Sequence, residues 1–227
     1  HIGGDVRASP AVNTGWLAFG ALIASFIGTT GASMLLIRPL LNTNRERKHK
    51  VHTVVMFIFL VSNVGGTLLP IGDPPLFLGY LEGVPFLWTF GLWIPWAFAC
   101  TLLLAIYFVW DTIIYAKESD AVKVFDRTNV QPLHLKGSIN ILWLFGVVVC
   151  VALIIPGNMI PLTKFEAFNF LRELAMLGLV ALSLITTRRS VRESNRFEYG
   201  AIIEVGALFI GIFIAMQVPI EVLKSQG

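Results

Sequence analysis

The segment TVVMFIFLVSNVGGTLLPIGDPPLFLGYL, residues 53–81, decides the fold of this chain. Its two ends are apolar enough for a transmembrane helix, but residues 62–75 between them hold three glycines and three prolines. Glycine and proline both disfavour a helix interior, so we expect the backbone to unwind there. Within a membrane, unwound backbone is tolerated only where protein buries it or where it lines a wet cavity. The polar side chains of this interruption therefore predict an ion or substrate site of the kind that transporters contain.

The composition places the chain among polytopic membrane proteins. Of its 227 residues, 56% are hydrophobic and 14% are charged, whereas a soluble domain carries roughly 25% charged residues. The net charge is +3, but Lys and Arg cluster in short loops between apolar segments, so we expect a lipid bilayer and no nucleic acid as partner. Cys100 and Cys150 lie inside apolar segments and are expected to be unpaired. His49 and His52 share a basic loop, and we assign them no metal.

The apolar segments predict an all-α bundle, because a helix needs about 20 residues to cross the hydrocarbon core. We expect one transmembrane domain over residues 1–227, and a fragment of a longer transporter, since His1 replaces an initiator methionine and few residues follow the last span. The predicted spans, the first of them broken, are residues 53–81, 86–115, 138–156, 170–187 and 200–218.

Residues 15–42 are also long enough for a span, but Gly28-Thr29-Thr30-Gly31 divides them almost in half. Each arm is then too short to cross alone. We favour a re-entrant hairpin with its tip at this sequence, because two glycines flanking two hydroxyls suit a tight turn. One long helix with a soft centre is the alternative.

Loops rich in basic residues alternate with loops that are poor in them. Residues 43–52, 116–137 and 188–199 each hold four Lys or Arg, whereas 82–85 hold none and 157–169 hold one. Because basic loops stay on the cytoplasmic side, the rich loops are assigned to the cytoplasm. We therefore predict an integral protein of the bacterial inner (plasma) membrane, whose broken span begins at the cytoplasmic side. The loop 116–137 is interpreted as a solvated connector.

The two interruptions supply the predicted site. An ionised Asp73 in hydrocarbon costs at least about 2.5–3.5 kcal/mol, unless it faces a cavity, takes a proton or pairs with a cation. Helix capping by Asp73 ahead of Pro74 is the structural alternative. Oxygen donors and the carboxyl end of a half-helix both suit a hard alkali cation. The predicted ion- or substrate-binding residues are Thr29, Thr30, Ser62, Asn63, Gly65, Gly66, Thr67, Gly72 and Asp73.

Among these residues, Asn63, Thr67 and Asp73 are the predicted ligands of Na⁺. We expect Na⁺ or H⁺ as the coupling ion and no further cofactor. A basic partner for an anionic substrate is absent from the interruption itself, although Arg38 could approach from the end of the hairpin.

Several motifs resemble those of a known family. Ser62-Asn63 with Gly65-Gly66-Thr67, and then Pro70-Ile71-Gly72-Asp73-Pro74, is similar to the broken-helix motif of the ion-transporter superfamily. The segments 27–33 and 197–205 resemble its citrate-transporter-like branch, often labelled sodium/proton antiporter. The resemblance implies two inverted repeats, each with a re-entrant hairpin and a broken helix around a midplane site, and a homodimer. The second repeat would follow beyond Gly227.

The leading hypothesis is a sodium/proton antiporter and not an enzyme, because Asp73 could titrate within the site. A sodium- or proton-coupled carrier of citrate or another dicarboxylate is the alternative, since helix N-termini and hydroxyls bind anions. A passive channel is a third possibility. An intramembrane aspartyl protease is a distant one, because two carboxylates must share a proton and no second Asp lies deep in another span.

Overall fold

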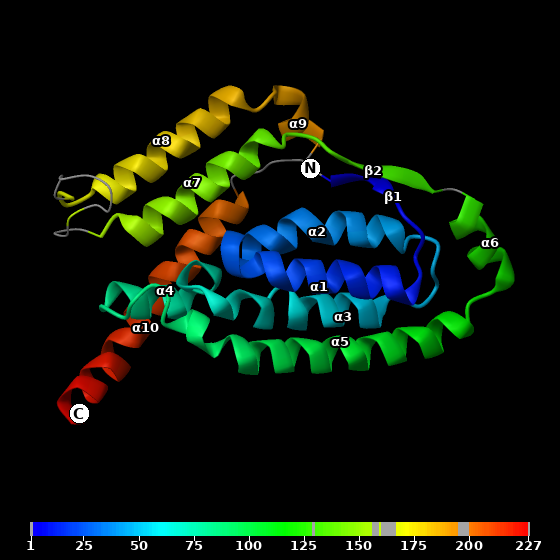
Figure 1. Ribbon diagram of the computed structural model, residues 1–227, viewed down its shortest axis with the longest axis horizontal. Coiled ribbons are helices and arrows are strands. Elements are labelled where there is room, and N and C mark those ends of the chain that lie inside the picture. Colours follow the sequence, from blue (N-terminus) through cyan, green and yellow to red (C-terminus); the bar gives the residue numbers. More distant parts are fainter. Residues whose placement is uncertain (1, 129, 156–158, 160–166, 195–199, 227) are drawn as a thin grey trace.

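The computed structural model of the protein describes residues 2–128, 130–155, 159, 167–194 and 200–226 (Figure 1). Lys164, Arg196 and the motif residues 197–199 lie outside the described residues. The first half of the chain contains β1 (Ile2–Asp5), α1 (Pro10–Ile27), α2 (Thr29–Thr43), α3 (Val51–Leu60), the 3-10 helices η1 (Val64–Leu68) and η2 (Pro70–Gly72), and α4 (Pro74–Leu81). The second half contains η3 (Thr89–Leu92), α5 (Trp93–Ala116), α6 (Asp120–Thr128), β2 (Gln131–Leu135), α7 (Ile139–Leu153), α8 (Leu171–Thr186), α9 (Arg189–Ser194) and α10 (Gly200–Gln226).

The architecture is that of a helical membrane protein. Four helical stretches are long and apolar enough to cross a bilayer, namely Pro10–Ile27, Val51–Leu68, Thr89–Ala116 and Ile203–Val222. Two predicted spans, 138–156 and 170–187, contain the shorter helices α7 and α8, of 15 and 16 residues. The last helix continues through Pro219 to Gln226, beyond the predicted end at residue 218.

The helix α1 begins earlier than the predicted boundary at residue 15. Ser9 caps it by accepting the N–H of Val12 (3.4 Å), and Pro10 occupies the first turn, where its missing N–H costs nothing. The arm is therefore 18 residues long, and the prediction that it is too short to cross alone was wrong on length. The helix ends at Gly28, whose φ of +78° favours glycine, and α2 starts at the next residue.

The helices α1, α2, α3 and α5 form the core of the molecule, and they lie side by side in Figure 1. The core contains Leu17 and Ala21 of α1, Leu36 of α2, Leu60 of α3 and Tyr107 of α5, all of them almost fully buried. α1 packs against each of the other three, so it is the central element. The helices α7 and α8 pack against each other at the edge of this bundle. The helix α10 contacts α4.

Two features differ from the prediction of an all-α bundle whose loop 116–137 is a solvated connector. β1 and β2 pair antiparallel, with Ile2 opposite Leu135 and Gly3 opposite His134. In addition, the loop 116–137 contains the helix α6, and Asp126 of that helix accepts the N–H of Ala8 (2.8 and 3.1 Å). Burial raises the pKa of the Asp126 carboxyl. The loop is thus a folded tether for the N-terminus and is more than a solvated connector.

Candidate functional site

The chain between α3 and α4 leaves the α-helix, and its backbone groups find other partners. The carbonyl of Val64 accepts the indole N–H of Trp96 (3.1 Å) and the hydroxyl of Thr67 (2.9 Å). The carbonyl of Leu68 accepts the hydroxyl of Thr89 (2.9 Å). A buried carbonyl without a partner would cost about 1–3 kcal/mol, so these side chains stabilise the unwound segment.

Ser25 makes two further contacts with this segment from the last turn of α1. Its fully buried hydroxyl donates to the carbonyl of Gly65 (2.5 Å) and accepts the N–H of Leu68 (3.2 Å). One side chain of α1 therefore satisfies both a donor and an acceptor of η1. Ser25 was not among the predicted site residues, because a lone serine within an apolar helix has no distinguishing pattern.

Three glycines allow the unwound segment to pack at backbone distance. A Cβ on Gly65 would lie 2.6 Å from the carbonyl oxygen of Leu60 and 2.7 Å from the Cα of Ala21. A Cβ on Gly66 would overlap the methyl group of Thr29, and one on Gly72 would overlap the carbonyl oxygen of Gly66. Glycine at these positions is therefore required by close packing between η1, η2 and the α1–α2 pair.

A cavity of about 300 Å³ lies where the start of α2 meets the segment that leads into α4. Gly28 and Ile71 approach closely here, since a Cβ on Gly28 would lie 3.5 Å from the carbonyl of Ile71. Residues of α7, α8 and α10 complete the walls with apolar side chains. The predicted site residues that line the cavity are Thr29, Thr30, Gly72 and Asp73.

The other predicted site residues lie outside this lining. The hydroxyl of Ser62 shares a hydrogen bond with that of Ser33 (2.7 Å), and Asn63 is exposed. The hydroxyl of Thr67 donates to the carbonyl of Val64 in the same 3-10 helix. Gly65 and Gly66 are buried. Of the three residues predicted to hold Na⁺, the cavity lining includes Asp73 alone. The described residues also contain no group of three or more His, Cys, Asp or Glu that could hold a metal ion.

Asp73 is the acidic residue of the cavity. It occupies the position before α4 with extended backbone (φ −143°, ψ 133°), but its side chain makes no capping hydrogen bond. Within the part of the chain that the structure describes, its partly buried carboxylate has no hydrogen-bond or ion-pair partner. The carboxylate thus faces a cavity with its full capacity to accept a proton or bind a cation.

The two helix starts at the cavity differ in what they offer a ligand. The first intrahelical bond of α2 runs from the N–H of Ala32 to the carbonyl of Gly28 (2.9 Å). The N–H groups of Thr29, Thr30 and Gly31 therefore have no carbonyl partner within the helix. The first two residues of α4 are prolines and carry no N–H. One side of the cavity thus favours an anion, and the side with Asp73 favours a cation.

A second polar cluster, which was not predicted from the sequence, lies at the other end of the same helices. Asp111 of α5 is fully buried and accepts two hydrogen bonds from Arg47 (2.6 and 3.1 Å). It also contacts His52 Nε2 (2.7 Å) and accepts the amide of Asn13 (3.3 Å). The amides of Asn13 and Asn44 exchange two hydrogen bonds of 2.8 Å. The cluster joins α1, α3, α5 and the loop after α2.

Aromatic side chains enclose this cluster. The guanidinium of Arg47 lies 5.2 Å from the ring centre of Tyr115, and the ring of His52 stacks on Tyr107 at 5.8 Å. Tyr107 in turn shares a hydrogen bond of 3.0 Å with Thr53. In the sequence, Arg47 served only as a topology signal. The need for a basic partner could have been anticipated from Asp111, since an acid near the end of an apolar helix needs one nearby, but the sequence does not indicate which residue supplies it.

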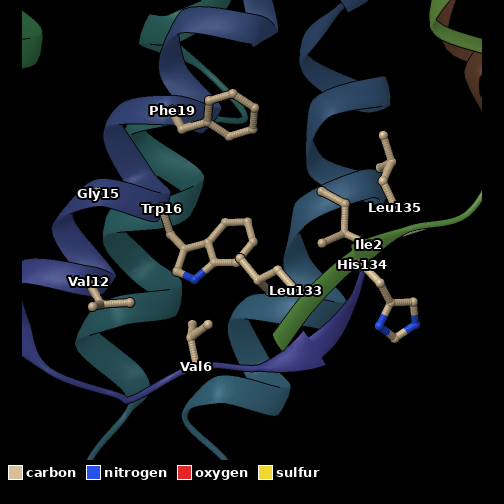
Figure 2. A pocket seen from close by; sticks show the side chains of 9 residues that line it. All are labelled: Ile2, Val6, Val12, Gly15, Trp16, Phe19, Leu133, His134 and Leu135. Carbon is tan, nitrogen blue, oxygen red and sulfur yellow. The ribbon is translucent and has the colours of Figure 1, made fainter. Parts of the chain in front are cut away.

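A groove of about 490 Å³ between α1 and the β1–β2 ribbon is apolar (Figure 2). Trp16 and Phe19 of α1 face Leu133 and Ile2 of the ribbon, and His134 lies at the edge. The groove offers a small polar substrate almost no hydrogen-bonding group. It is therefore not the candidate site.

These features define a helical integral membrane protein. Its cavity lies between two interrupted segments and is largely apolar, with polar groups at Thr29, Thr30 and Asp73, an arrangement that transporters use. The chain belongs to the family described as "Putative citrate transport", which matches residues 1–227. No curated protein and no solved structure matches the chain. The family confirms the resemblance to citrate-transporter-like ion transporters and identifies the protein as a membrane transporter.

Proposed function

We propose that the protein is a cation-coupled carrier of citrate or a related carboxylate, acting in the bacterial inner membrane. The observation that supports this proposal is the cavity between the start of α2 and Asp73. Its volume of about 300 Å³ lies at the low end of the usual range for small-molecule pockets, roughly 300–1,000 Å³. A compact organic anion suits a cavity of this size.

The donors of the cavity favour a carboxylate substrate. The backbone N–H groups and hydroxyls of Thr29 and Thr30 are hydrogen-bond donors at the positive end of the α2 dipole, so they favour binding of an anion. Arg38 does not line the cavity, so these neutral donors would provide the anion contacts. The family match likewise favours the carboxylate carrier over the sodium/proton antiporter, which was the leading hypothesis from the sequence.

In this proposal Asp73 binds the coupling ion, either Na⁺ or a proton. Its carboxylate has no partner among the described residues and lies beside the proposed anion site, so a bound cation would reduce the repulsion between Asp73 and the substrate. Substrate and cation would then bind together, as coupled transport requires. We further propose that α1–α2 is a re-entrant hairpin, that residues 53–81 form a broken span, and that the carrier is a homodimer.

Uptake of labelled citrate by liposomes that contain the protein tests this proposal. We expect uptake to require an inward Na⁺ or proton gradient and to saturate with citrate. The double variant Thr29→Ala/Thr30→Ala should raise the KM for citrate about tenfold, the equivalent of about 1.4 kcal/mol of lost binding. Thr112→Ala is the matched control, because its hydroxyl bonds to its own helix on an exposed surface. Sodium/proton exchange without citrate uptake would contradict the proposal.

A further inference from the structure

A second cavity, of about 430 Å³, lies between α7, α8 and α9, beside the end of β2. It is separate from the candidate site in its lining, since the two cavities share no residue. Figure 1 shows α7 and α8 side by side, with α9 and the end of β2 together at one end of the pair. We propose that this cavity binds the headgroup and the first part of an acyl chain of an anionic phospholipid.

One end of the cavity is polar and positively charged. Lys136 and Arg192 both line it, and the described lining contains no acidic residue. Asn140 also lines the cavity, and its carbonyl oxygen accepts the hydroxyls of Ser183 (2.7 Å) and Thr187 (2.9 Å). These two bonds fix the amide so that its NH₂ group faces away from the hydroxyls. Two cations and one oriented donor match the phosphate of a lipid headgroup.

The rest of the cavity is apolar and follows the two helices. Leu144 of α7 faces Val180 and Leu184 of α8, and all three side chains are partly exposed. In a membrane these side chains would contact hydrocarbon. The cavity therefore changes from charged to apolar along its length, as a phospholipid does between headgroup and chain. A small anion such as citrate or phosphate has no apolar part to cover this surface.

The position of the charged end agrees with the predicted topology. Lys136 and Arg192 come from the loops 116–137 and 188–199, which the charge distribution assigns to the cytoplasm. The cytoplasmic leaflet carries the anionic lipids, and basic pockets between helices on that side bind their headgroups. The proposal concerns a lipid that binds beside the transport path and does not depend on the identity of the transported substrate.

The test compares lipid binding to the purified full chain in a neutral detergent by native mass spectrometry. Phosphatidylglycerol and phosphatidylcholine with identical chains are the two probes. We expect a clear preference for phosphatidylglycerol. The double variant Lys136→Gln/Arg192→Gln should lower it about 30-fold, the equivalent of about 2 kcal/mol for two basic residues near the surface. Lys48→Gln/Lys117→Gln removes the same charge from exposed positions outside the cavity and should keep the preference.

Competition with millimolar citrate or inorganic phosphate distinguishes a lipid site from a small-anion site. We expect neither anion to displace the lipid. Displacement by either of them would overturn the proposal, and so would equal binding of the two lipids. A preference that both double variants lower equally would also overturn it, because the effect would then come from net charge. Size-exclusion profiles of the variants show whether each remains folded.

Discussion

Asp73 and Asp111 are both acids within apolar helical regions, but their surroundings are opposite. Asp111 is fully buried and contacts a guanidinium, an imidazole and an amide. Asp73 lines a cavity and has no polar partner among the described residues. A carboxylate whose acceptor positions are all occupied holds its neighbours in place, whereas one without partners is free for a ligand. Charge alone would not separate these two roles.

The location of each acid supports this distinction. The Asp111 cluster joins α1, α3 and α5 at the end of the bundle near the basic loop 43–52. Asp73 lies near the opposite end of α1, where that helix stops at Gly28. The helix α1 is thus held at one end by the Asp111 cluster, whereas its other end, at Ile27, lines the cavity. Rigidity at one end and access at the other suit a transporter.

The largest expected effect is on the stability of the Asp111 cluster. Asp111→Ala leaves Arg47 buried without its partner, which should cost about 3–5 kcal/mol in the free energy of unfolding. Thermal unfolding in detergent, followed by circular dichroism, measures this loss. Asp120→Ala is the matched control, because the Asp120 carboxylate is fully exposed.

The double variant Asp111→Leu/Arg47→Met sharpens the same test. It removes both charges at once, so it should be considerably more stable than Asp111→Ala alone. If the single and double variants unfold at the same temperature, Asp111 does not act through its ion pair with Arg47.

The second effect is on transport by Asp73→Asn. We expect cation-coupled uptake to fall by at least about 100-fold, the equivalent of about 2.7 kcal/mol, with the unfolding temperature unchanged. Uptake into liposomes and thermal unfolding on the same preparation measure both quantities. Asp120→Asn should leave both unchanged. A variant at residue 73 that unfolds early but transports normally would reverse the assignment of the two acids.

The third effect is on the packing that shapes the cavity. Gly72→Ala places a methyl group against the carbonyl of Gly66 and should cost about 1–3 kcal/mol of stability. Transport should fall as well, because Gly72 lines the cavity. Gly178→Ala is the control: a Cβ there meets nothing within 4 Å, so that helix should gain about 0.5–1 kcal/mol. If Gly72→Ala and Gly178→Ala are equally stable, the backbone of η1 and η2 can move apart to accommodate the methyl group at residue 72, which would contradict the close packing described above.

The smallest effect is on the pH dependence of stability at Glu118, which follows α5 in the loop beyond the Asp111 cluster. Burial alone would raise the pKa of the Glu118 carboxyl, but hydrogen bonds from the N–H groups of His49 and Lys48 hold its pKa below the ordinary value. A lowered pKa stabilises the fold at neutral pH, and this contribution disappears as the pH falls through the folded-state pKa.

Thermal unfolding of the protein and of Glu118→Gln across pH 7 to about 3 tests this expectation. The difference between them should be largest near neutral pH and should shrink in acid. A difference that grows as the pH falls would have the wrong sign for this carboxylate.

The sequence alone predicted the class of the protein. Gly28 is a local signal at which α1 stops, and α3 stops at Leu60, just before the Gly- and Pro-rich residues 62–75. The start of α1 and the end of α10 differ from the predicted bounds. Local rules also explain why Thr29 begins a helix and Asp73 precedes one, whereas the packing of these segments brings both residues to one cavity. The relation of these segments to the two membrane surfaces stays a prediction.

Long-range pairing was beyond the sequence. The contact of Arg47 with Asp111 joins residues 64 positions apart, and only the packing of α5 against the bundle creates it. The β1–β2 ribbon is another example, because neither strand alone has a strong pattern. Asn63 was assigned to the site from the end of its half-helix, but the fold turns it to an exposed position outside the cavity lining.

The ribbon has a consequence for biosynthesis. Ile2 and its partner Leu135 are more than 130 residues apart, so β1 leaves the ribosome long before β2 exists. At roughly 5–20 residues per second, that interval is about 7–26 s. All helices from α1 to α6 are made within it. The ribbon therefore closes a loop around a set of helices already synthesised, and it should be among the last contacts that the nascent protein forms.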